Sequence, residues 1–198
     1  DWSAELSYAV GLITTDGCLS KDGRHIDLTS KDRDQIETFR QILHLNTNKI
    51  GLKSSGFSVK KYYRIEFSNV KLYRFLIEIG LTPAKSKTLG ILKVPSKYFW
   101  DLLRGEYDGD GCSYAYWDKR WRSSFMFYTC FVSASRKHLD WLQGEIYKRI
   151  GISGHITHAE GYSIYQLKYA KADSLRLLKR MYSSPQVVCL SRKRLKIE

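Results

Sequence analysis

The spacing of apolar residues along the first half of the chain switches repeatedly between a helical and a strand-like period. Small and apolar residues fill the segment Ser3–Thr15, which predicts a helix. Asp16-Gly17 is expected to end this helix, with Gly17 in the left-handed conformation. The pattern then predicts a strand at 24–29, a helix at 31–45, strands at 49–53 and 57–68, and a helix at 70–80.

The second half of the chain repeats this order of elements. Its pattern predicts a helix at 99–109, a long hairpin at 117–132, a helix at 136–150, two strands within 154–169 and a helix at 172–182. The hairpin is rich in aromatic residues, and we interpret Trp117 and Trp121 as residues that pack within it rather than stack on bases. We therefore divide the chain into two related units, 1–94 and 95–198.

Composition narrows the classes of partner. With 33 Lys and Arg against 20 Asp and Glu, the net charge is 33 − 20 = +13, and such a field attracts polyanions, nucleic acid first. No apolar run reaches the roughly 20 residues that span a bilayer, so no membrane partner is expected. Four cysteines without a CxxC pair argue against zinc and against a disulfide framework. We expect an intracellular, reducing compartment, either the cytoplasm of a prokaryote or an organelle.

One short segment occurs twice in the chain. Val10–Cys18 and Arg104–Cys112 are both small-residue helical segments that end in Asp-Gly-Cys. The two aspartates, Asp16 and Asp110, are 110 − 16 = 94 residues apart, about half the chain. The same offset pairs Gly11 with Gly105 and Thr15 with Gly109.

The duplicated segment predicts a close helix crossing. Small residues recur three and four positions apart, so they share one helical face and allow two backbones to approach closely. The predicted interface residues are Gly11, Thr15, Gly105 and Gly109. Such a crossing would bring Asp16 and Asp110 together at helix C-termini, where paired carboxylates need a cation such as Mg²⁺. One Asp-Gly alone is a common helix end; the duplication at matched phase favours a paired site.

The two segments carry a family resemblance. The first reads AVGLITTDG over Ala9–Gly17 and the second LRGEYDGDG over Leu103–Gly111. Together they resemble the motifs of the LAGLIDADG homing endonucleases, in the single-chain form that has two motifs. The first motif departs from the family pattern at Thr14, where an acid is frequent. The matching residues are Gly11, Leu12, Ile13, Asp16 and Gly17, then Gly105, Asp108, Asp110 and Gly111.

The resemblance implies an α+β fold. It consists of two pseudo-symmetric αββαββα units packed through paired motif helices, with antiparallel sheets that form a DNA-binding saddle. Because both motifs lie in one chain, a monomer is expected.

The resemblance also implies a reaction. Asp16 and Asp110 would bind Mg²⁺ or Mn²⁺ and hydrolyse one phosphodiester in each strand of a long specific target, leaving short 3′ overhangs. Ca²⁺ is expected to support binding without cleavage. Lys87 and Lys193, which occupy matching places after the third helix of each unit, would assist catalysis, or would contact phosphate or solvent only. Asp108 is expected to be structural. The gene would be encoded in an intron, or would once have been nested in another gene.

Polar residues on the predicted strands are the expected DNA contacts, since Arg, Lys, Gln and Glu distinguish base edges in the major groove. A solvated surface is the alternative for any one of them. The set is Arg24, Lys53, Ser58, Lys60, Tyr62, Arg64, Glu66, Arg120, Arg122, Ser124, Tyr128, Gln166 and Lys168.

Two other functions fit the same sequence. One is an RNA-binding intron maturase on the same scaffold, with intron RNA as partner. The other is a DNA-binding relative that does not cleave. The presence of both Asp16 and Asp110 favours cleavage over the second, but it does not exclude the first.

Overall fold

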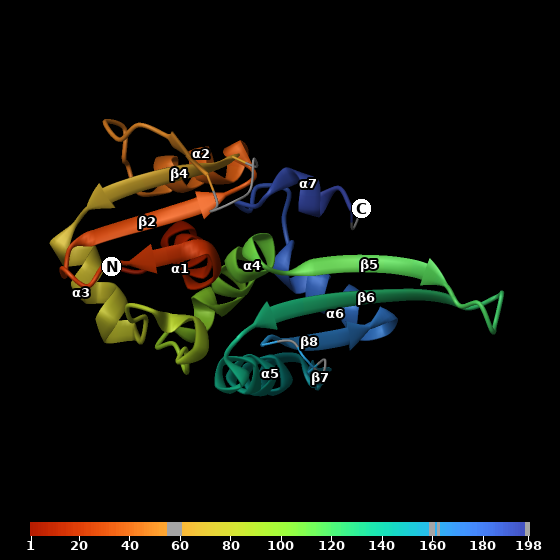
Figure 1. The fold of residues 1–198 in the computed structure, drawn as a ribbon. Coiled ribbons are helices and arrows are strands. Elements are labelled where there is room, and N and C mark those ends of the chain that lie inside the picture. The colour runs from red at the N-terminus through yellow and green to blue at the C-terminus, as the bar shows by residue number, and fades with distance from the viewer. Residues whose placement is uncertain (55–60, 159–160, 162, 197–198) are drawn as a thin grey trace. The chain divides into compact units, whose positions relative to one another are not determined.

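A computed structural model describes residues 1–54, 61–158, 161 and 163–196. The fold is α+β with two four-stranded antiparallel sheets, as the sequence predicted (Figure 1). The chain forms two compact units. The first contains residues 1–85 and 92–109, and the second contains residues 86–91 and 110–198.

The first unit takes its last helix from the second sequence repeat. Its elements are α1 (Ala4–Asp16), β1 (Gly17–Leu19), β2 (His25–Ser30), α2 (Arg33–Ile42), β3 (Gly51–Ser54), β4 (Lys61–Ser68), α3 (Val70–Ile79), the short 3-10 helix η2 (Ser96–Tyr98) and α4 (Phe99–Gly109). The sequence repeat was divided between residues 94 and 95, whereas α4 packs with the first unit because its small residues fit against α1.

The first sheet has one apolar and one polar face. Its strand order is β1-β2-β4-β3, with all neighbours antiparallel. Alternate residues such as Leu28 and Ile65 are fully buried on the core face. Asp27 pairs across the strands with Glu66, which is exposed on the opposite face. This alternation is what a half-buried antiparallel sheet requires.

The second unit repeats the sheet topology. Its elements are η1 (Lys85–Lys87, which straddles the boundary), β5 (Cys112–Trp117), β6 (Phe125–Ser133), α5 (Arg136–Ile150), β7 (His155–His158), β8 (Tyr165–Ala170), α6 (Lys171–Met181) and α7 (Ser191–Arg194). The strand order β5-β6-β8-β7 corresponds to that of the first sheet. Phe131, Leu167 and Tyr169 lie in its core.

Most helix predictions are confirmed, and local chemistry explains the ends. The predicted bounds of α4 and α5 are those observed. Ser3 caps α1 by accepting a hydrogen bond from the Leu6 N–H at 3.0 Å, and Asn69 caps α3 in the same way through the Leu72 N–H at 2.9 Å. Gly80 ends α3 with a φ of 112°, a conformation that favours glycine.

The predicted conformation of Gly17 is wrong. Its φ is −89° and its ψ is 155°, so the residue is extended and begins β1 directly after α1. Glycine is needed here for space rather than for a left-handed turn, because a Cβ would lie 2.6 Å from the Cα of Ile13. In the described part of the chain, every helix is too short or too polar to cross a bilayer.

Candidate functional site

Two helices of the first unit, α1 and α4, cross at glycines. A Cβ on Gly11 would overlap the carbonyl oxygen of Leu102 and would lie 2.8 Å from the Cα of Gly105. A Cβ on Gly105 would overlap the carbonyl oxygen of Tyr8 and would lie 3.0 Å from the Cα of Gly11. Real Cβ atoms do not tolerate such distances to backbone. The predicted close crossing at Gly11 and Gly105 is therefore present.

The other predicted interface pair is complementary rather than symmetric. The Thr15 hydroxyl fills the space that a Cβ on Gly109 would need, and it donates to the Leu12 carbonyl oxygen at 3.1 Å. The carboxylate of Asp16 lies beside it, since the same Cβ would be 2.8 Å from Asp16 Oδ2. Asp16 is half-buried, and Asp110, the residue after Gly109, is exposed.

Asp108, the other acid of the second motif, is buried in the packing of α4. Only 1% of its surface is exposed, and its carboxylate accepts a hydrogen bond from the Tyr8 hydroxyl at 2.8 Å. Its carbonyl oxygen accepts a hydrogen bond from the Gln35 amide at 3.1 Å. These contacts tie α1, α2 and α4 together at the level of the motif, which is a structural task.

Each motif ends in a glycine whose carbonyl oxygen accepts a hydrogen bond from a buried lysine. In the first unit the donor is the Lys85 ammonium and the acceptor is Gly17. In the second unit the Lys193 ammonium donates to the Gly111 carbonyl oxygen at 2.7 Å. Lys85 and Lys193 are only 7% and 6% exposed. Lysine is almost never buried without a partner, and here each ammonium has a carbonyl oxygen.

The structural counterpart of Lys193 is therefore Lys85, whereas the sequence alignment paired it with Lys87. Lys87 is exposed at the end of η1. The two-residue error arises because a single 3-10 turn carries Lys85, Ser86 and Lys87, and the pattern of apolar residues does not show which lysine faces inward. Nothing in the sequence indicates that Lys85 is buried and Lys87 is exposed.

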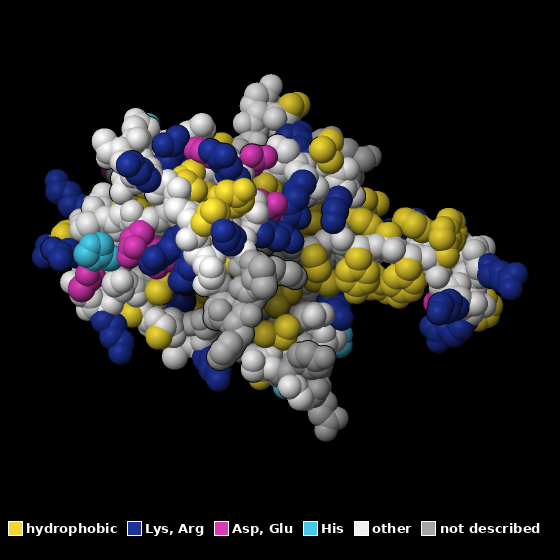
Figure 2. Space-filling view, turned by 45° about the horizontal axis from the view of Figure 1, so that its top comes forward, with side chains coloured by type: hydrophobic (Ala, Val, Ile, Leu, Met, Phe, Trp, Pro, Cys, Tyr) yellow, Lys and Arg dark blue, Asp and Glu magenta, His cyan; other side chains and the backbone are white. Residues whose placement is uncertain are grey.

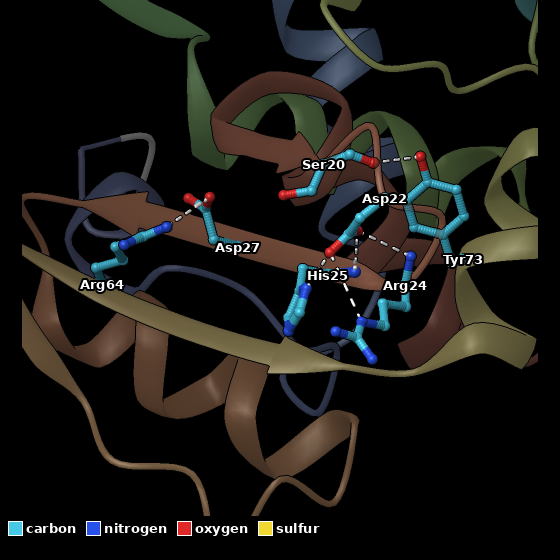
Figure 3. Close-up of polar contacts among 7 residues, drawn as sticks. All are labelled: Ser20, Asp22, Arg24, His25, Asp27, Arg64 and Tyr73. Atoms are coloured by element: carbon cyan, nitrogen blue, oxygen red, sulfur yellow. Dashed lines mark hydrogen bonds and ion pairs between the residues drawn. The ribbon is translucent and has the colours of Figure 1, made fainter.

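The polar face of the first sheet carries an arginine between two acids. Arg64 on β4 lies 3.0 Å from the Asp27 carboxylate on β2 (Figure 3). It also lies 3.2 Å from the Glu66 carboxylate. The Asp27 hydrogen bond raises the pKa of Arg64 above its ordinary value. The two acids hold the guanidinium in one orientation, which leaves it positioned on the open face. Predicted contact residues Arg64 and Glu66 thus share one network.

The remaining predicted contacts of this unit are placed as follows. Lys53 on β3 pairs across the sheet with Tyr62 on β4, on the same face as Arg64. Arg24 is exposed in the β1–β2 hairpin, and Figure 3 shows it beside Asp22. Ser58 and Lys60 lie outside the described residues.

Asp22 organises that hairpin. Its carboxylate accepts hydrogen bonds from the backbone N–H groups of Arg24 and His25, each at 3.1 Å, and also contacts the His25 ring (Figure 3). The His25 side-chain hydrogen bond holds the pKa of Asp22 well below its usual value. The Tyr73 hydroxyl donates to the Ser20 carbonyl oxygen at 2.5 Å, which ties the hairpin to α3.

The second sheet carries aromatic and basic residues on the corresponding face. Tyr128 on β6 stacks with Tyr114 and Tyr116 of β5 at ring separations of 5.4 and 6.2 Å. Burial raises the pKa of Tyr114 to about 12. Gln166 and Lys168 lie half-buried on β8 and share this face with Tyr128. The sequence interpretation included Tyr128 and missed the two tyrosines of β5, whose alternation predicts the same face.

Three predicted contact residues lie in the β5–β6 loop rather than on a strand. Arg120 and Arg122 are exposed, and Ser124 directly precedes β6. Arg120 is held by Asp118, whose carboxylate accepts from the Arg120 backbone N–H at 2.8 Å and lies 3.3 Å from its guanidinium. The hydrogen bond with the Arg120 side chain lowers the pKa of Asp118.

A metal site can be judged here only by its donors. No group of three or more His, Cys, Asp or Glu residues suited to a metal ion occurs within 1–54, 61–158, 161 and 163–196. Asp16 and Asp110 are carboxylates near the ends of the two motifs, and Asp16 Oδ2 lies beside Gly109, close to the Thr15 hydroxyl. A carboxylate is a ligand that Mg²⁺ accepts together with water and phosphate oxygens.

Comparison with known proteins places this geometry in a family context. Residues 4–80 match the family model described as LAGLIDADG-like domain. The comparison with curated protein sequences found no match. The matched residues include the first motif, Ala9–Gly17, and support the family resemblance there.

Solved structures with this fold cover nearly the whole chain. Full-length DUF199/WhiA from Thermatoga maritima is 13% identical with a TM-score of 0.62, covering 100% of this chain and 62% of that one. This chain therefore spans less than two thirds of that protein. The homing endonuclease I-WcaI bound to its DNA recognition sequence is 10% identical with a TM-score of 0.67, covering 100% and 88%. I-DmoI in complex with DNA and Mn is 18% identical with a TM-score of 0.59, covering 91% and 97%.

Proposed function

Because residues 4–80 carry a LAGLIDADG-like domain and the whole chain has the LAGLIDADG fold, we propose that this protein is a site-specific, metal-dependent endonuclease that cuts double-stranded DNA. One observation carries the proposal above the others. The glycine crossing of α1 and α4 sets the Asp16 carboxylate against Gly109, one residue before Asp110. Helix α1 ends at Asp16 and Asp110 directly follows α4, so an aspartate stands at the C-terminal end of each crossing helix.

Asp16 and Asp110 are the proposed metal ligands. Their charge is unfavourable at helix C-termini, where the helix dipole is also negative, so a divalent cation would relieve it. Mg²⁺ or Mn²⁺ held by these carboxylates would supply a positive charge to polarise the scissile phosphate and to favour ionisation of the attacking water. Ca²⁺ is proposed to support binding without cleavage.

The two buried lysines are proposed to position the acids. By holding the Gly17 and Gly111 carbonyl oxygens, Lys85 and Lys193 fix the backbone immediately after each aspartate. Their ammonium groups also place positive charge at the motif ends, where the scissile phosphate would gain negative charge in the transition state of cleavage. We therefore assign to Lys85 the place that the sequence assigned to Lys87, and we retain Lys193. Lys87 itself is proposed to contact a phosphate.

The polar sheet faces are the proposed DNA contacts. A strand pair fits the major groove, where Arg is a bidentate donor to guanine and Gln to adenine. Arg64, Lys53, Gln166 and Lys168 present this chemistry on the two faces. The net charge of +13 supplies the phosphate attraction that underlies binding to any sequence. Because both motifs lie in one chain, we propose that the protein is a monomer. We also propose that its gene is intron-encoded and that cleavage leaves 3′ overhangs.

A non-cleaving DNA-binding protein is the second candidate. The observation that favours it is the likeness to DUF199/WhiA, a protein that is not named as a homing endonuclease. Fold likeness at these identities therefore does not separate cleavage from binding.

The test is to incubate the purified protein with a randomised double-stranded DNA library and to sequence the ends. Defined cuts in Mg²⁺ with short 3′ overhangs, and binding of the same sequences without cuts in Ca²⁺, would support the endonuclease. Selective retention of some sequences without cuts in either metal would favour the non-cleaving candidate. If the folded protein selected no duplex but selected structured intron RNA, the maturase would replace both.

A further inference from the structure

The hairpin of β5 and β6 extends beyond the rest of its sheet. Strand β8 pairs with β6 only over Tyr128–Ser133, so Phe125–Phe127 pair only with Ala115–Trp117. We call residues 115–127, which comprise these strand ends and their loop, the arm. Figure 1 shows the arm projecting past β8 and α6 of the same unit.

Large aromatic side chains of the arm are open to solvent. Trp117 is 61% exposed and Trp121 is 70% exposed, and Tyr116 beside them is 47% exposed. The interpretation of both tryptophans as packing residues is therefore wrong for Trp121; Trp117 does contact Phe125, with ring centroids 5.1 Å apart. Exposed rings of this size mark an interaction surface more often than chance.

The fold does not need the arm. The first unit closes the corresponding corner with the β1–β2 hairpin, where β1 has three residues against six in β5. That hairpin has no aromatic residue in its loop, and Tyr73 ties it to α3 through Ser20. The extra length and the two tryptophans of the second hairpin thus have a purpose other than completing the sheet.

Charge identifies the occupant of this surface. The loop at the tip contains Lys119, Arg120 and Arg122, all exposed, against one acid, Asp118. Figure 2 shows hydrophobic side chains along the projecting hairpin and Lys and Arg side chains gathered at its tip. Cations beside exposed aromatic rings are the combination that binds single-stranded nucleic acid, in which the cations face phosphates and the rings stack on bases.

We propose that the arm binds unpaired nucleotides of a DNA or RNA strand, with Trp117 and Trp121 as stacking platforms and the loop cations as phosphate contacts. The bases of a duplex are already stacked on one another, so a single strand offers these rings base faces that a duplex does not. The proposal concerns a different form of nucleic acid from the proposed cleavage reaction, and it gives Arg120 and Arg122, which the sequence suggested as duplex contacts, a role on a single strand.

The test measures fluorescence anisotropy of fluorescein-labelled oligo(dT) and oligo(rU), each about 12 nucleotides long, one OB-fold site size being about 4–16. The full chain is titrated, with unlabelled duplex of the same length as competitor. Trp121→Ala, which leaves the Trp117–Phe125 contact in place, should weaken binding about tenfold, and the Trp117→Ala/Trp121→Ala double variant still more. Tighter binding of one oligonucleotide would identify the strand that the arm binds as DNA or RNA. Equal affinity for both would support stacking on the bases without contacts to the sugar.

Trp141→Phe is the matched control. Trp141 lies on α5 of the same unit and packs on the His138 ring at 5.4 Å, away from the arm, so its replacement should not change oligonucleotide affinity. Circular dichroism spectra check that each variant is folded. Equal affinity of wild type and both arm variants would overturn the proposal. So would displacement by duplex as efficient as by single strands, or a dimer in sedimentation that Trp121→Ala dissociates without changing oligonucleotide affinity.

Discussion

The crossing of α1 and α4 makes a quantitative prediction for Gly11→Ala. The added methyl would overlap the carbonyl oxygen of Leu102 and would stand 2.8 Å from the Glu106 nitrogen and the Gly105 Cα. All three atoms are backbone, so no side-chain rotation relieves the overlap. Overpacking of a close-packed interior costs about 1–3 kcal/mol, and a rigid backbone contact belongs at the upper end.

Part of this loss is offset, because alanine is about 1 kcal/mol better than glycine in a helix. We therefore expect the free energy of unfolding to fall by about 2 kcal/mol, which for a chain of this size lowers the Tm by about 4–8 °C. Thermal and urea denaturation followed by circular dichroism measure both quantities.

Gly144→Ala is the matched control for this prediction. Gly144 also lies inside a helix, α5, but a Cβ there meets no heavy atom within 4 Å. The same substitution should stabilise the protein there by about 0.5–1 kcal/mol. If Gly11→Ala melted at or above the wild-type temperature, the two helices would not be as close as the structure places them, and the reasoning would fail.

Three further predictions test single contacts. Tyr8→Phe removes the hydroxyl bonded to buried Asp108 and should lower the free energy of unfolding by about 1–3 kcal/mol in urea denaturation, whereas an unchanged midpoint would mean that the bond contributes nothing. Arg64→Ala should weaken duplex binding about 10–100-fold in filter binding. Arg64→Lys should not restore the affinity, because an ammonium cannot form a bidentate contact with guanine. If wild type and both variants bound the duplex with equal affinity, Arg64 would not belong to the interface. Lys193→Met should slow cleavage about 100-fold while Ca²⁺-dependent binding persists. Lys87→Met, at an exposed position, should slow cleavage far less. If Lys87→Met slowed cleavage more than Lys193→Met, the catalytic role would return to Lys87.

The sequence was most informative where chemistry and period coincide. Gly11 and Gly105 stand at the same phase of two related helices, and only a close crossing gives both of them a reason to be glycine. The alternation in β4 likewise assigned Arg64 and Glu66 to the polar face, because a period of two leaves one choice once the apolar residues are buried.

The remaining features depend on contacts that the sequence does not encode locally. Lys85 and Lys87 lie on one 3-10 turn, and only Lys85 faces inward. The contact that decides this is with the Gly17 carbonyl oxygen, 68 residues away in the sequence. The exposure of Trp121 follows from the place where β8 stops pairing with β6. Gly17 is glycine because of its distance from Ile13, whereas its sequence context suggested a left-handed cap.

The central claim is that Asp16 and Asp110 act together in a metal-dependent cleavage site. The most direct measurement compares the wild type with Asp16→Asn and Asp110→Asn on one cleaved duplex, in Mg²⁺ for cleavage and in Ca²⁺ for binding. Each substitution keeps the shape of the side chain and removes its charge. The account predicts that each variant binds the duplex in Ca²⁺ and fails to cut it in Mg²⁺. Cleavage at the wild-type rate by either variant would contradict the account.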